Sequence, residues 1–64
     1  MPYKNNDDLP ESIKNVLPEH AQTIFRKAFN SAIHEYDSEK TAMKVAWSAV
    51  KKDYEKKDDK WVKK

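Results

Sequence analysis

The length and composition of this 64-residue chain exclude several classes of protein. It contains no cysteine, which excludes disulfides and thiolate metal sites, and no glycine, which excludes the glycine-rich loops that cradle phosphates. Its length suits one domain, residues 1–64, and no apolar run typical of a signal peptide or a membrane-spanning helix is present. We therefore expect a soluble, cytoplasmic and monomeric protein that binds neither a cofactor nor a small-molecule substrate.

Charge is nearly balanced over the whole chain, at net +2, but it is distributed unevenly. Residues 1–50 carry six basic and seven acidic side chains, whereas residues 51–64 carry seven lysines and four acidic residues. This mildly basic end is either a solvated, solubilising segment or a patch for nucleic acid or an acidic surface. The single arginine, Arg26, favours the first interpretation, because arginine is the usual reader of phosphates and base edges.

Prolines delimit a short first helix. Pro10 suits the first turn of a helix, where its missing N–H would have no partner in any case. Because the residue before a proline is displaced from the helical region, Pro18 should end this helix. We therefore expect it to run from Pro10 to Asn15 or Val16.

The second expected helix, from Pro18 to Tyr36, has the clearest 3.6-residue period in the sequence. Its apolar residues form one wide stripe, and its polar and charged residues lie elsewhere, which is typical of a helix with one face in the core. The stripe consists of Ala21, Ile24, Phe25, Ala28, Phe29, Ala32, Ile33 and Tyr36.

A short connection and a third helix follow. Ser38 is a favourable N-cap, and Glu39 follows it in the first turn, so we expect a helix from Glu39 to Tyr54 or Lys56. A connection of about three residues makes the second and third helices antiparallel neighbours. The apolar stripe, whose alanines allow close approach, consists of Ala42, Met43, Val45, Ala46, Trp47, Ala49, Val50 and Tyr54.

The two ends of the chain, residues 1–4 and 60–64, are each too short for a helix. We expect them to form a minimal antiparallel β pair, with Tyr3 and Trp61 or Val62 covering the helical core. The alternative is that both ends are frayed tails. The predicted fold class is mainly α: a three-helix domain with a minimal antiparallel β pair formed by the N- and C-terminal ends.

No arrangement of side chains predicts catalysis or a metal site. His20 and His34 lie about 21 Å apart along one helix and cannot bind one metal together. The serines have no base and orienting group suggested beside them. The acidic pairs at 7–8 and 58–59 would approach each other only if the ends meet. They would then suit weak Ca²⁺ or Mg²⁺ binding, although turn and capping chemistry also explains them. We expect no catalytic or metal-binding residues.

The lysine-rich end contains the residues that we predict to bind a partner. Lysines flank Trp61, a combination that binds single-stranded nucleic acid in some proteins and also suits an acidic partner. Trp61 is equally well interpreted as a core residue, and for Phe25, Phe29 and Trp47 we favour the core. The candidate binding residues are Lys51, Lys52, Lys56, Lys57, Lys60, Trp61, Lys63 and Lys64.

Several motifs together resemble the ChaB family, and they cover essentially the whole chain. The first half contains Met1-Pro2-Tyr3-Lys4, Asp8-Leu9-Pro10-Glu11-Ser12, Val16-Leu17-Pro18 and His20-Ala21-Gln22. The second half contains Ala28-Phe29-Asn30-Ser31-Ala32, the stretch from Thr41 to Lys51, Tyr54 and the closing Lys60-Trp61-Val62-Lys63-Lys64.

This resemblance implies three helices with a small sheet and no catalytic motif. It also implies a non-enzymatic regulator whose protein partner is a membrane cation antiporter of the Na⁺/H⁺ and Ca²⁺/H⁺ type, after which the family is named. Nucleic-acid binding, suspected for viral relatives, is the alternative. Some bacterial members have a longer charged loop between the second and third helices, where this chain has only residues 37–40.

Overall fold

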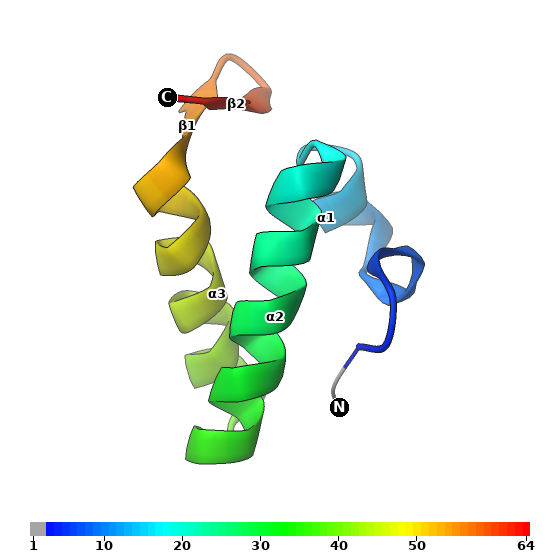
Figure 1. Ribbon diagram of the computed structural model, residues 1–64, viewed down its shortest axis with the longest axis vertical. Helices are drawn as coiled ribbons and strands as arrows, with labels where there is room; N and C mark the ends of the chain where they lie inside the picture. The colour runs from blue at the N-terminus through cyan, green and yellow to red at the C-terminus, as the bar shows by residue number, and fades with distance from the viewer. Residues whose placement is uncertain (1–2) are drawn as a thin grey trace.

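The computed structural model describes residues 3–64, which fold into a 3₁₀ turn, three α-helices and a β-hairpin (Figure 1). In chain order the elements are η1 (Asn6–Asp8), α1 (Glu11–Lys14), α2 (Glu19–Tyr36), α3 (Glu39–Asp53), β1 (Tyr54–Lys57) and β2 (Lys60–Lys63). These elements confirm the predicted class, three helices with a minimal antiparallel β pair. Within residues 3–64, no helix combines the length and the apolar content that crossing a membrane requires.

Helices α2 and α3 lie side by side and run antiparallel, as predicted (Figure 1). Their connection is tight because Asp37 takes the left-handed conformation, φ 51°, and its backbone N–H donates to the carbonyl of Ile33. Aspartate is one of the few residues besides glycine that adopts this region. Ser38 then caps α3, and its side chain accepts a hydrogen bond from the backbone N–H of Thr41.

Small residues bring the two long helices together. Ala21 and Ala32 of α2 and Ala42 and Ala46 of α3 are buried, so the two helix backbones approach closely. Larger side chains fill the space around this seam: Leu9, Ile13, Leu17, Phe25, Phe29, Val50 and Tyr54. The predicted stripe of α2 therefore faces the core, except that its last member, Tyr36, is 53% exposed.

The N-terminal segment is bound to α2 by a side-chain amide. The backbone N–H of Tyr3 donates to Asn30 Oδ1, and Asn30 Nδ2 donates to the carbonyl of Tyr3, both at 2.7 Å. The ring of Tyr3 packs on Phe29 with ring centroids 4.9 Å apart. Tyr3 therefore covers the core as predicted, while Asn30 satisfies its backbone in the way that a neighbouring strand would.

The β pair is a C-terminal hairpin, which corrects the predicted strand partner of residues 60–64. Strand β1 pairs antiparallel with β2, and a two-residue connection joins them. Asp58 makes this turn possible by adopting φ 56°. Tyr3 and Lys4 belong to no strand, and the expected contribution of Met1 and Pro2 lies outside the described residues.

The helix boundaries follow from the same packing. Helix α3 ends at Asp53 rather than at Tyr54 or Lys56, because Tyr54 is extended, with φ −130° and ψ 155°. Burial of Tyr54 against the core and strand pairing replace the helical turn that the sequence period suggested. Pro10 and Pro18 occupy N-cap positions, so α1 and α2 begin one residue after each proline.

Candidate binding groove

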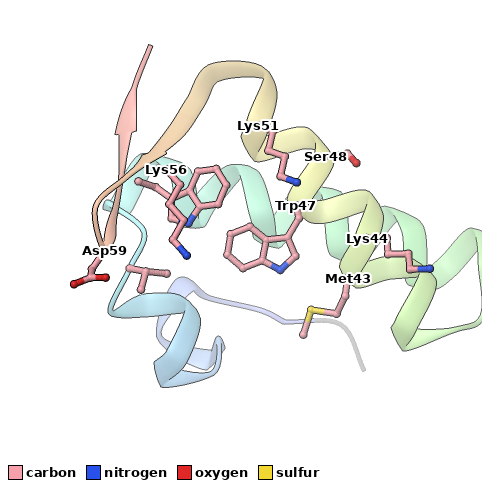
Figure 2. Close-up of a pocket in the computed structure, with 9 residues that line it drawn as sticks. Met43, Lys44, Trp47, Ser48, Lys51, Lys56 and Asp59 are labelled. Carbon is pink, nitrogen blue, oxygen red and sulfur yellow. The ribbon is translucent and has the colours of Figure 1, made fainter.

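A groove of about 700 Å³ lies between α3 and the hairpin (Figure 2). The outward face of α3 and the hairpin line it, and the link between α1 and α2 adds one residue. The lining residues are Val16, Met43, Lys44, Trp47, Ser48, Lys51, Lys56, Asp59 and Trp61. We call it the tryptophan groove, because it is lined by Trp47 and Trp61, which are the only two tryptophans in the chain.

Trp47 connects the core to the groove. Its ring meets that of Phe25 edge to face, with centroids 5.0 Å apart and an interplanar angle of 71°. It also stacks on Trp61, at 5.3 Å and 30°. Such aromatic pairs contribute about 0.5–1.5 kcal/mol beyond the burial of their surface. Both tryptophans are only partly buried, so they pack against the core and still contribute surface to the groove.

The spacing of residues on α3 places four of them along the groove. Lys44, Trp47, Ser48 and Lys51 follow one another at i, i+3, i+4 and i+7, which puts them on one helix face. This face points away from the alanines that pack against α2. Figure 2 shows Trp47 at the middle of the lining, between Met43 and Lys56.

The hairpin supplies the opposite side through its alternation. Directly opposed residues in an antiparallel pair share a face, so Lys56 and Trp61 lie on one face of the hairpin. Tyr54 lies on this same face, because it is two residues from Lys56, and Tyr54 is buried against the helices. The face with Lys56 and Trp61 is therefore the one that meets the helices.

Backbone hydrogen bonds fix the hairpin in this position. The N–H of Trp61 donates to the carbonyl of Val16 at 3.1 Å, which ties β2 to the link between α1 and α2. The N–H of Lys64 donates to the carbonyl of Asp53 at 3.0 Å, which ties the end of the chain to the end of α3. The groove is thus built on elements that are held at both ends.

The structure divides the predicted binding residues between two sides of the hairpin. Lys51, Lys56 and Trp61 line the tryptophan groove. Lys57 and Lys60 instead line a separate hollow of about 400 Å³, together with Asp58, Asp59 and Val62. Lys52, Lys63 and Lys64 are exposed and line neither space. The lysine-rich end is therefore not one continuous patch.

Sequence reasoning missed several residues of the groove. Lys44 and Ser48 lie outside the lysine-rich segment, Met43 was placed in the apolar stripe, and for Trp47 the core was favoured. A helical projection of residues 43–51 would have found them, because it separates the alanine face from a face that carries Trp47 between two lysines. Val16 carries no such signal, since its position depends on the docking of β2.

His20 and two of the acidic residues, Asp8 and Asp58, take structural positions. The ring of His20 lies 6.3 Å from that of Tyr54, and Asp8 accepts a hydrogen bond from the backbone N–H of Asn5. Asp58 forms the hairpin turn. Among residues 3–64, no three or more histidine, cysteine, aspartate or glutamate side chains cluster in a way that could hold a metal ion.

Comparisons with known proteins agree with this architecture. The family model of ChaB matches residues 9–64. The chain is 55% identical to proteins named "Putative cation transport regulator ChaB" in Escherichia coli (strain K12) and Shigella flexneri, with 100% of this chain and 99% of each relative covered. A solved structure described as "NMR solution structure of the putative cation transport regulator ChaB" is 54% identical, with a TM-score of 0.90, and covers 98% of this chain and 99% of that one.

The relatives are longer than this chain. Their alignment spans 75 positions, whereas this chain has 64 residues, so 11 positions have no counterpart here. The structural similarity nevertheless extends over nearly the full length of both chains. Since the family model matches most of the sequence and the relatives match over their whole length, the chain belongs to the ChaB family.

Proposed function

We propose that this chain is a non-enzymatic regulatory protein that binds a protein partner in the tryptophan groove. The partner is the cytoplasmic face of a membrane cation antiporter. The name of the relatives, which describes a regulator of cation transport, supports the regulatory role and a partner that transports cations.

The partly buried stack of Trp47 and Trp61 carries the proposal. Tryptophan is enriched among the few residues that dominate binding energy at protein interfaces. The groove volume of about 700 Å³ is in the range that accommodates a few side chains of a partner. A rigid aromatic surface beside charged side chains suits a regulatory contact better than it suits bond-breaking chemistry.

The test measures binding and transport with the same variants. Binding to the cytoplasmic segments of a cation antiporter from the same organism is followed by calorimetry, and transport is followed in inverted membrane vesicles. We expect Trp61→Ala to weaken binding about tenfold or more and to remove the effect on transport, because it deletes one half of the indole pair.

Tyr36→Ala is the matched control, since it removes an aromatic ring that is 53% exposed at the opposite end of the fold. It should leave binding and transport unchanged. If the wild-type protein does not alter transport, or if Trp61→Ala binds as tightly as wild type, the proposal is wrong.

Nucleic-acid binding is the second candidate, and the lysines beside the indole pair are the observation that favours it. Lys44, Lys51 and Lys56 line the same groove. Three phosphate contacts would give a salt slope of roughly −3 on duplex DNA. A mobility-shift assay at low salt tests this candidate, and the absence of any shifted band with duplex or single-stranded DNA would remove it.

A further inference from the structure

Positive charge predominates around the tryptophan groove. Lys44 and Lys51 of α3 and Lys56 of β1 line it, against the single carboxylate of Asp59. All four residues are exposed. Three lysines against one carboxylate give the lining of the groove a local excess of two positive charges. Charge complementarity therefore favours an occupant with negative charges.

Hydrogen-bonding capacity leads to the same occupant. Ammonium and indole N–H groups donate hydrogen bonds and cannot accept them. Among the lining side chains, only Asp59 and Ser48 offer strong oxygen acceptors. The groove therefore suits an occupant that presents acceptors, and carboxylates add short, charge-assisted hydrogen bonds to the lysines.

Between the lysines the lining is apolar. Val16, Met43 and the two indoles form this part, and methionine adapts its shape readily to an incoming side chain. Trp47 already packs against Phe25 and Trp61, so its ring is engaged by the protein itself. An aliphatic side chain can pack against whatever part of the indoles is exposed, whereas a nucleobase needs a free ring face for stacking.

The spacing on α3 defines the geometry of the occupant. Lys44 and Lys51 are seven residues apart, which corresponds to two helical turns and about 10 Å along the axis. Trp47 lies between them on the same face. A helix laid along α3 matches this pattern when it carries acidic residues at i and i+7 and aliphatic residues at i+3 and i+4.

We infer that the tryptophan groove binds an acidic amphipathic helix of the partner protein. Aliphatic side chains of that helix rest on Trp47 and Trp61, and its carboxylates pair with Lys44, Lys51 and Lys56. This inference rests on the proposed function, because it specifies the chemistry of the protein partner at the same site.

The fluorescence of the protein reports directly on this groove, because both tryptophans of the chain line it. The probe is a 15-residue alanine-based peptide, acetylated and amidated, with glutamates at positions 4 and 11 and leucines at positions 7 and 8. Two control peptides replace the glutamates by lysines or the leucines by alanines. We expect saturable changes in emission with the first peptide and about tenfold weaker binding, or none, with either control.

Neighbouring lysines provide matched controls in the protein. Lys51→Gln and Lys56→Gln should each weaken peptide binding by about two- to fivefold, as expected for pairs exposed to solvent. Lys52→Gln and Lys57→Gln remove the same charge one residue away, outside the groove, and should leave binding unchanged. The triple variant with Lys44→Gln added should lose about tenfold or more.

Two further probes test whether the groove binds single-stranded nucleic acid or a lipid surface instead. If a 12-residue oligothymidylate or phosphatidylglycerol vesicles change the emission at lower concentration than the acidic peptide, the inference is wrong. It is also wrong if the lysine-substituted peptide binds as well. An antiporter segment whose binding depends on Trp61 but not on the three lysines would keep the proposed function and overturn only the acidic helix.

Discussion

The two faces of α3 differ in nearly every physical property. The face toward α2 carries Ala42, Ala46 and Val50, each with 0% of its surface exposed. The face toward the tryptophan groove carries exposed Lys44 and Lys51 on either side of a partly exposed Trp47. The first face determines how closely the helices pack, and the second contributes little to that packing. The exposed lysines, which the packing of the helices does not use, are therefore concentrated where a partner could bind.

The largest expected effect on stability comes from removing the ring of Phe25, which connects the core to the groove face of α3 through Trp47. Phe25 is fully buried, and its ring supports Trp47. Phe25→Ala should lower the free energy of unfolding by about 3–5 kcal/mol, because it removes a large buried side chain and leaves a cavity. Urea denaturation followed by circular dichroism measures this loss. A decrease below about 1 kcal/mol would contradict the assignment of Phe25 to the core.

The N-terminal segment tests whether a polar contact stabilises the fold in addition to apolar packing. Asn30→Ala removes both hydrogen bonds to Tyr3 and should lower the free energy of unfolding by about 1–3 kcal/mol. Asn15→Ala is the control, since Asn15 is exposed and lies outside the N-terminal segment. The same denaturation curves measure both variants. Equal stability of the two would mean that the segment is held by the ring of Tyr3 alone.

The helices could be predicted because their signals are local. The period of Ala21, Phe25, Phe29 and Ala32 identifies the buried face of α2 without any tertiary information. The cap at Ser38 was equally readable, since it depends on residues three positions apart. In both cases the same short stretch of sequence specifies the geometry and the contact.

The docking of the hairpin and the groove that it lines depend on contacts between distant residues, such as the hydrogen bond from the N–H of Trp61 to the carbonyl of Val16. Tyr54 continues the helical period of α3, yet it is extended, because burial and pairing with β2 outweigh local preference. The two strands lie next to each other in sequence, so their pairing closes a very short loop, which carries a small entropic penalty. The groove joins residues 16, 43–51 and 56–61, and no local pattern connects these three segments.

A smaller effect is expected at the start of α3. Ser38→Ala removes the side chain that accepts a hydrogen bond from the N–H of Thr41, so the free energy of unfolding should fall by about 1 kcal/mol. Ser31→Ala is the control, because Ser31 is exposed within α2, where alanine is a better helix former. Thermal and urea denaturation should rank Ser31→Ala at or above wild type and Ser38→Ala below it.

The smallest expected effect on stability belongs to the groove face itself. Replacing Lys44, Lys51 and Lys56 together by glutamine should change the free energy of unfolding by no more than about 0.5 kcal/mol, because all three side chains are exposed. Removing three neighbouring positive charges also reduces repulsion among them, which offsets any packing lost from their aliphatic stems. Urea denaturation at low and at moderate salt measures the change.

A loss of more than about 1.5 kcal/mol would assign these lysines to the fold and would contradict the comparison of the two faces. Unchanged stability together with weaker peptide binding would instead show that these lysines act in binding and not in folding. Since Phe25→Ala should change stability and the lysine variants should change binding, the pair of results assigns folding to the core around Phe25 and recognition to the exposed lysines of the groove.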